Sequence, residues 1–319
     1  MPDVIVAEVV RSGFVESCHW GSAVAVDAAG AVILSAGDVS KPVFPRSSNK
    51  PLQAAAMVSA GLPLRGRLLA LACASHSGEP FHLDGVREML ATAGLSESVL
   101  QTPPDWPLDE TARIAAIRDG ADPSALAMNC SGKHAAMLLT SAANGWDLDS
   151  YRRPSAPVQV AIGEGFERLT GEPVAAVGVD GCGAPLLATS LTGLARAFSR
   201  LRLAPAGTAE HAVAEAITGF PTYVSGSRRD EALLLQAMPG VIAKAGAEGS
   251  YALALPDGVA VALKIADGAA RARPVVMAQV LRLLGHHHAV LDQVATVPVF
   301  GHCHPVGEIR GVVDRQLAS

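Results

Sequence analysis

The sequence predicts an α+β fold in which helices and strands are intermixed along the chain. Half of the 319 residues are apolar and only 17% are charged, so a large part of the chain must be buried. Short β-type runs bounded by Gly, Pro or Asp alternate with apolar segments of helical periodicity. No internal repeat or low-complexity linker divides the chain. We therefore expect one domain over residues 1–319, either undivided or made of two lobes.

The chain is predicted to open with an antiparallel sheet. Residues 4–10 and 22–27 have extended patterns, and a turn at Ala29 and Gly30 leads into a third extended segment at 31–35. Further short β-type runs follow in the second half of the chain, at residues 174–179, 258–265 and 295–300.

Three helices are predicted in the first half of the chain. Residues 47–51 have the composition of a helix start, with Pro51 in the first turn, and an Ala/Leu/Met-rich run continues to Gly61. Residues 83–93 carry an apolar stripe, and a third helix follows Gly132. The apolar segment at 68–74 is interpreted as a buried strand.

Charge and cysteine content exclude several protein classes. The net charge of −5 and the absence of a Lys/Arg run argue against nucleic-acid and membrane-surface partners. No apolar stretch approaches the roughly 18 to 20 residues of a membrane span. The N-terminus lacks a secretory pattern, and five dispersed cysteines do not form a disulfide scaffold. We expect a soluble cytoplasmic protein.

Ser47 and Lys50 form the first candidate catalytic pair. A serine hydroxyl needs a base to become a nucleophile, and an unprotonated lysine can serve. Residues three apart share a helix face, which favours Ser47 over Ser48 as the partner of Lys50. The alternative is that either serine only caps the helix and that Lys50 is a surface charge.

Cysteines and a carboxylate suggest a metal site. Cys130 and the segment Asp180–Cys182 lie in tight Gly-containing turns and could supply most of a tetrahedral zinc shell. The alternative is that both cysteines are buried structural residues. Histidines at 286–288 and 302–304 are conceivable ligands as well, but exposed loops are the favoured interpretation.

Two further segments carry polar groups beside apolar ones. A Ser/His/Glu triad within residues 74–79 is disfavoured, because adjacent residues on a strand point to opposite faces. Lys264 lies in an apolar strand pattern, either as an edge-strand charge or as a functional amine in a desolvated place.

Taken together, these segments resemble motifs of the class 3 L-asparaginases. They occur in family order: residues 45–51 (PRSSNKP), 74–79 (ASHSGE), 129–134 (NCSGKH), 180–183 (DGCG) and 244–249 (KAGAEG). Residues 15–17 (VES) and 306–310 (VGEIR) are similar to the family's two ends. One departure lies near Gly226, where Arg228, Arg229, Asp230 and Glu231 replace the usual Arg and Asp-Thr pattern.

The resemblance implies a serine β-lactamase-like fold, with a mainly antiparallel sheet flanked by helices and an active site between two lobes. It implies hydrolysis of L-asparagine by a homodimer and two Ser-Lys pairs, Ser47 with Lys50 and Ser75 with Lys264. It also implies a zinc site, whose matching residues are Cys130, Lys133, Asp180 and Cys182. The alternatives are a glutaminase or broader ω-amidase, a penicillin-recognising hydrolase and a non-catalytic zinc-binding protein.

Overall fold

The computed structural model describes residues 2–314, which form two compact units. Within the described residues, unit 1 combines residues 2–48, 188–203 and 233–314. Unit 2 combines residues 49–187 and 204–232. Neither unit is a single continuous stretch, because the chain passes from one to the other several times.

Unit 1 is built on an antiparallel sheet of eight described strands. The strand order is β6-β7-β8-β2-β1-β10-β9, and β3 pairs with β2 beside this path. The strands are β1 (Val4–Arg11), β2 (Phe14–Val26), β3 (Val32–Ala36), β6 (Ile242–Ala245), β7 (Ser250–Ala254), β8 (Ala260–Ile265), β9 (Val297–Gly301) and β10 (His304–Gly311).

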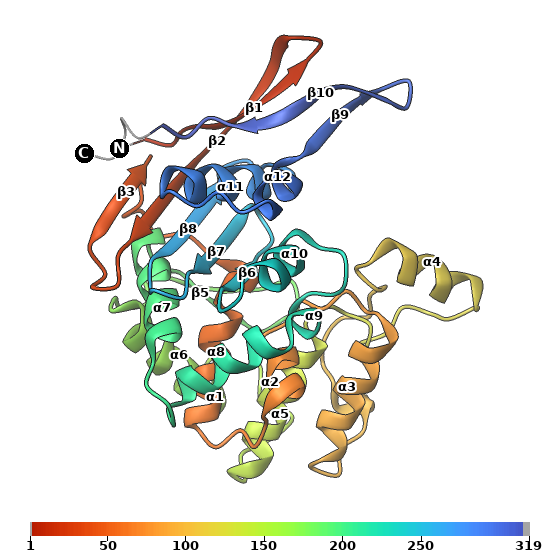
Figure 1. The fold of residues 1–319 in the computed structure, drawn as a ribbon. Coiled ribbons are helices and arrows are strands. Elements are labelled where there is room, and N and C mark those ends of the chain that lie inside the picture. Colours follow the sequence, from red (N-terminus) through yellow and green to blue (C-terminus); the bar gives the residue numbers. More distant parts are fainter. Residues whose placement is uncertain (1, 315–319) are drawn as a thin grey trace. The chain divides into compact units, whose positions relative to one another are not determined.

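Strand β2 connects two parts of this sheet. Its first half pairs with β1, and its second half, from Gly21 to Val26, pairs with β8. The second half is almost fully buried, whereas the first half is largely exposed and forms a hairpin with β1 (Figure 1). Helices α7 (Leu191–Leu203), α11 (Ala272–Leu283) and α12 (Val290–Ala295) pack in this unit, with α7 and α11 against the sheet.

Unit 2 is mostly helical, with α1 at its centre. Helix α1 packs against α5, α6 and α8, and Gly165 permits the close approach of α6 because a Cβ there would lie 2.5 Å from that of Ala56. The helices are α1 (Lys50–Ser59), α2 (Gly66–Ala72), α3 (Pro80–Ala91), α4 (Glu110–Arg118), α5 (Ser131–Ala143), α6 (Pro157–Thr170), α8 (Ala209–Gly219) and α9 (Pro221–Val224).

The remaining elements are short or lie at the division between units. Strands β4 (Val177–Val179) and β5 (Pro185–Leu187) form a hairpin in unit 2, which also holds the 3₁₀ helix η2 (Glu97–Val99). The 3₁₀ helix η1 (Arg46–Asn49) leads directly into α1, and α10 (Asp230–Ala237) crosses from unit 2 to unit 1.

The structure confirms the predicted fold class and corrects one element. The fold is α+β, with a mainly antiparallel sheet and flanking helices, and the three predicted helices are present as α1, α3 and α5. The expectation of a strand at 68–74 is wrong, since most of that segment forms α2. The segment contains mainly Leu and Ala, which favour helix over strand. No helix among the described residues is long and apolar enough to cross a bilayer.

His82 makes the stability of this fold depend on pH. Its side chain on α3 is fully buried and lies 3.0 Å from the carbonyl of Thr222, and burial lowers its pKa from 6.5 to about 4. Below pH 6.5 the unfolded chain therefore binds a proton that folded His82 does not, and the free energy of unfolding falls until about pH 4. We expect a loss of about 3 kcal/mol from this group.

Urea unfolding of wild type and His82→Gln across this pH range checks the prediction. The variant should show a shallower decline in the free energy of unfolding between the two pKa values, because it has no imidazole at this position to protonate. A decline as steep in the variant as in the wild type would mean that other groups cause the acid sensitivity.

Candidate active site

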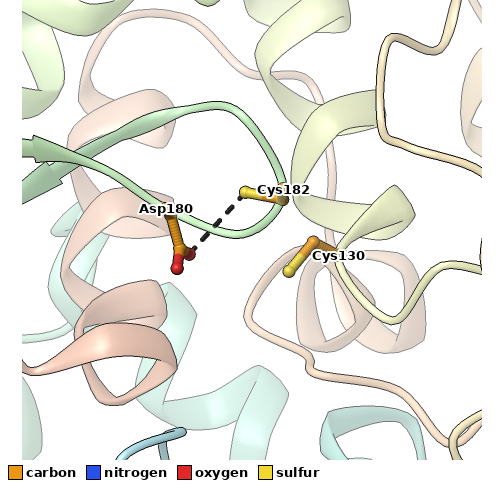
Figure 2. Close-up of side chains that lie close together, drawn as sticks. All are labelled: Cys130, Asp180 and Cys182. Carbon is orange, nitrogen blue, oxygen red and sulfur yellow. Dashed lines mark hydrogen bonds between the residues drawn. The ribbon is translucent and has the colours of Figure 1, made fainter.

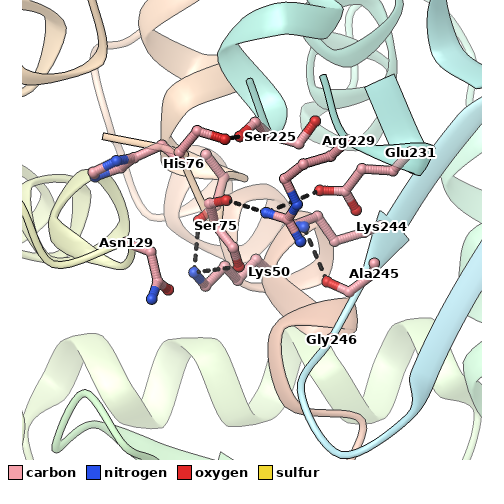
Figure 3. A network of polar contacts seen from close by, with 12 residues as sticks. Lys50, Ser75, His76, Asn129, Ser225, Arg229, Glu231, Lys244, Ala245 and Gly246 are labelled. Atoms are coloured by element: carbon pink, nitrogen blue, oxygen red, sulfur yellow. Dashed lines mark hydrogen bonds and ion pairs between the residues drawn. The ribbon is translucent and has the colours of Figure 1, made fainter. Parts of the chain in front are cut away.

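Lys50 links several polar groups inside unit 2. It is the first residue of α1 and is only 1% exposed, so the interpretation as a surface charge is wrong. Its Nζ donates to the carbonyl of Ala74 at 2.6 Å, to Ser75 Oγ at 3.0 Å and to Cys130 Sγ at 3.1 Å. Figure 3 shows Lys50 and Ser75 facing each other. The structure thus brings together two predicted catalytic residues, which the sequence had assigned to different pairs.

The segment that carries Ser75 is held by a neutral histidine. Ser75 is 5% exposed and follows the C-terminal end of α2. The next residue, His76, accepts from the Gly78 N–H through Nδ1, and its Nε2 lies 2.8 Å from the hydroxyl of Ser131. Complete burial keeps the His76 pKa well below 6.5. His76 therefore supports the backbone around Ser75 as a neutral ring.

A second segment of unit 2 packs on the same loop. Ser77 Oγ donates to the carbonyl of Ser225 at 2.6 Å, and Gly226 lies so close that a Cβ would be 2.2 Å from that hydroxyl. Arg229 donates to the carbonyl of Ser75 at 2.7 Å and lies 3.7 Å from the carboxylate of buried Glu231 (Figure 3). Arg229 therefore fixes the backbone of Ser75, although its motif departs from the family pattern.

The predicted metal ligands come together in unit 2. Cys130 precedes α5, and Asp180 and Cys182 lie in the turn between β4 and β5. One ligand atom from each of these three lies within 4.8 Å of the others, and both cysteines are buried (Figure 2). Lys133, one turn along α5, donates to Cys182 Sγ at 3.2 Å. The four predicted ligands are thus neighbours, while exposed His287, His288 and residues 302–304 lie outside this group.

Hydrogen bonds and charges in this cluster favour the thiolate form of Cys130, which lies beside the amines of Lys50 and Lys133. The hydrogen bond from Cys182, together with the charges of Lys50 and Lys133, holds the pKa of Cys130 well below its usual range despite burial. The Cys182 pKa is raised by its hydrogen bond with Cys130 and by burial. Although burial favours a neutral amine, the sulfur atoms and Asp180 raise the pKa of Lys133 above its usual value.

This donor set fits zinc. Two sulfur atoms and a carboxylate are ordinary zinc ligands, and ligand atoms around a tetrahedral zinc ion lie about 3.5 Å apart. Cys182 Sγ lies 3.7 Å from Asp180 Oδ2 and 3.2 Å from Lys133 Nζ, which matches that spacing. Only a neutral amine can coordinate, so binding through Lys133 would require the loss of its proton.

Ser47 lies in unit 1, in the 3₁₀ helix that leads into α1. Its side chain is half-buried, and its hydroxyl makes no hydrogen bond within residues 2–314. Helix α1 begins after Asn49 without a side-chain cap, so neither Ser47 nor Ser48 caps it. The residue before Ser47 is Arg46, whose φ of +52° is in the left-handed region that non-glycine residues rarely adopt. The pairing of Ser47 with Lys50 stays a prediction.

Lys264 also lies in unit 1, on β8. Because β8 pairs with both β2 and β7, the edge-strand interpretation of this lysine is wrong. Its Nζ donates to the carbonyl of Glu248, and burial, together with the charge of Arg46, lowers its pKa below the usual value. The pairing of Lys264 with Ser75 likewise stays a prediction.

Three buried polar residues have no role in the sequence-based predictions. Lys244 on β6 is fully buried and donates to the carbonyl of Ala245 at 2.9 Å, and its apolar surroundings in the sequence gave the same signal as those of Lys264. His134 and Tyr151 are fully buried near the cysteine cluster. His134 lies inside a recognised motif, whereas nothing in the local sequence marks Tyr151.

The comparison with protein families decides the identity of the chain. The model described as L-asparaginase II matches residues 7–311. The chain belongs to the L-asparaginase II family. Membership in the L-asparaginase II family confirms the resemblance found in the sequence and indicates a hydrolase of asparaginase type that acts on amides. No curated protein matches the chain.

Several solved structures are similar to this member of the L-asparaginase II family. A β-lactamase from Mycobacterium bovis is 18% identical, with 82% of this chain and 94% of that chain covered and a TM-score of 0.46. Mglu in its native form is 16% identical over 84% of this chain and 65% of that one, with a TM-score of 0.38. EstCE1, a hydrolase with promiscuous acyltransferase activity, is 12% identical over 91% of this chain and 93% of that one, also with a TM-score of 0.38.

Proposed function

We propose that this protein hydrolyses the side-chain amide of L-asparagine to L-aspartate and ammonia through an ester on a serine. The observation that carries the proposal is the buried contact of 3.0 Å between Lys50 Nζ and Ser75 Oγ, in a chain of the L-asparaginase II family. A buried amine next to a hydroxyl is the arrangement that serine–lysine hydrolysis requires.

Ser47 is the proposed nucleophile, and Lys50 is its base. Ser75 is 5% exposed and its hydroxyl already bonds to Lys50, whereas Ser47 is half-buried and its hydroxyl has no hydrogen bond within residues 2–314. Backbone strain of the kind seen at Arg46 costs about 1–3 kcal/mol and is concentrated at functional sites. The position of Arg46 directly before Ser47 supports the assignment of Ser47 as the nucleophile. The spacing of three residues between Ser47 and Lys50 supports it as well.

The reaction then runs in two balanced halves. Lys50 must first lose to water one of the protons with which it donates to Ala74, Ser75 and Cys130. As a neutral amine it then takes the Ser47 proton while Oγ forms a bond to the carboxamide carbon. The C–N bond breaks, and the nitrogen leaves as ammonia with that proton, which Ser75 relays from Lys50. Water then attacks the β-aspartyl ester, Lys50 takes one of its protons, and Ser47 regains a hydrogen as L-aspartate leaves. Lys264 is proposed to assist Ser75.

Zinc is proposed to be held by Cys130, Lys133, Asp180 and Cys182. When bound, it would supply positive charge that orients substrate, and the nucleophile would remain Ser47. Because Lys50 bonds to both Ser75 and Cys130, ordering of the Cys130 side chain also orders the proposed base. A homodimer is proposed from the family resemblance.

Ammonia release from asparagine and glutamine tests the proposed substrate. The longer side chain of glutamine adds one methylene, and a pocket that fits asparagine discriminates against it by about 10- to 200-fold in kcat/KM. We therefore expect a preference of this size for asparagine. Equal or higher kcat/KM for glutamine would support the ω-amidase alternative, and full zinc content without release of ammonia from either would support a non-catalytic role.

A further inference from the structure

His134 lies beside the cysteine cluster and has no part in the proposed reaction. It follows Lys133 on α5, and its side chain is fully buried. Its Nδ1 is 2.7 Å from the hydroxyl oxygen of Tyr151, and the two rings meet edge to face at 5.5 Å. Tyr151 is itself fully buried, so this contact is shielded from solvent.

The contacts of Tyr151 fix which nitrogen of His134 carries the proton. The phenolic oxygen also accepts from the backbone N–H of Gln101 at 3.1 Å, and these are its two hydrogen-bond partners among the described residues. A backbone N–H can only donate, so the phenolic hydrogen is available for the imidazole. If Nδ1 carried the ring proton and donated it to the phenolic oxygen, the phenolic hydrogen would be buried without an acceptor. Tyr151 therefore donates to Nδ1, and the proton of the neutral ring is on Nε2.

The other ring nitrogen of His134, Nε2, has no hydrogen-bond partner among the described residues. It is buried and makes no hydrogen bond of standard geometry within residues 2–314. The side chain of Cys182 interacts with this ring. The ligand atoms that lie within 4.8 Å of one another come from Cys130, Asp180 and Cys182, so His134 stands outside that set. The His134 ring therefore interacts with the side chain of a predicted ligand while lying outside the ligand set.

We propose that His134 positions Cys182 for metal binding, with its Nε2–H as donor to the Cys182 sulfur and Tyr151 as the group that locks the ring. A hydrogen bond to a ligating thiolate orients the sulfur and stabilises its charge, and loss of such an outer contact typically weakens metal binding about 10- to 100-fold. Zinc binding can be measured without hydrolysis, so the test of this inference is separate from that of the proposed function.

Competition for zinc between the full chain and a chromophoric chelator tests the inference. We expect His134→Leu to weaken zinc binding about 10- to 100-fold, because the donor is removed. His134→Gln should recover most of the affinity, since its amide N–H can take the place of Nε2–H. Tyr151→Phe should weaken binding less than His134→Leu, because the ring remains but its orientation is no longer fixed. His82→Leu, at another buried histidine of unit 2, is the matched control and should bind zinc as the wild type does.

Four results would overturn the inference. The first two are an unchanged zinc affinity in His134→Leu and an equal loss of affinity in the His82→Leu control. The third is that the wild type binds no zinc. The fourth is that X-ray absorption of the wild type shows a histidine ligand to zinc, and that this signal is lost in His134→Gln. If His134→Leu does not fold, nitrogen NMR of the His134 ring still decides. The wild type should show the Nε2-protonated tautomer, and Tyr151→Phe should no longer be restricted to that tautomer. An Nδ1-protonated ring in the wild type contradicts the inference.

Discussion

Ser47→Ala is expected to abolish hydrolysis of asparagine, with kcat reduced by at least about 10⁴-fold. The change removes the oxygen that is proposed to form the ester, and neither Lys50 nor Ser75 replaces that bond. The fold should be retained, because the Ser47 side chain is half-buried and its hydroxyl has no hydrogen bond within the described residues. Steady-state ammonia release, with circular dichroism to verify folding, measures both effects.

Ser48→Ala is the matched control for this experiment. Ser48 is the neighbouring serine, is fully buried and lies 3.3 Å from the hydroxyl of Ser250 within unit 1. Its loss should cost about 1 kcal/mol of stability, the usual contribution of one hydrogen bond, and leave kcat within a few-fold. If Ser48→Ala lost activity and Ser47→Ala kept it, the nucleophile assignment would move by one residue.

Lys50→Met is expected to reduce kcat by about 10²- to 10⁴-fold, the usual contribution of a general base. Methionine has a similar length and suits a buried site, but it cannot accept the serine proton or donate to Ser75 and Cys130. Zinc content should also fall, since Lys50 is the charge partner of the Cys130 thiolate. Ammonia release and metal analysis of the purified variant check both expectations.

Lys50→Arg separates the role of base from that of charge. Arginine keeps the positive charge beside Cys130 but stays protonated in proteins, so it cannot serve as a base. We expect this variant to retain more zinc than Lys50→Met and to be similarly inactive. Substantial activity in Lys50→Arg would show that a fixed positive charge is sufficient, and the base role would be wrong.

Much of the fold could be predicted from local patterns. The antiparallel start and three of the helices follow from alternation, apolar stripes and the Pro and Gly residues around them. The prediction of a strand at residues 68–74 is wrong because a short apolar run has the same appearance in a buried strand and a buried helix. Its Leu and Ala content was the signal that favoured helix α2.

The sequence predicts which residues form the candidate site, but it predicts only some of the contacts between them. Family order identified Lys50, Ser75 and Cys130, which lie far apart in the sequence, and the structure shows that Lys50 contacts both of the others. Spacing along the chain can relate only residues on one helix or strand, so it could not reveal this contact. Tyr151 was out of reach for the same reason, because its role depends on His134 and Gln101.

Location of the covalent intermediate tests the central claim most directly. Enzyme mixed with saturating asparagine can be quenched in acid within milliseconds, digested and analysed by peptide mass spectrometry. We expect the β-aspartyl ester on the peptide that contains Ser47, with fragmentation placing it on that residue. An ester on Ser75 instead, with Ser47 unmodified, would contradict the account and make the serine that contacts Lys50 the nucleophile.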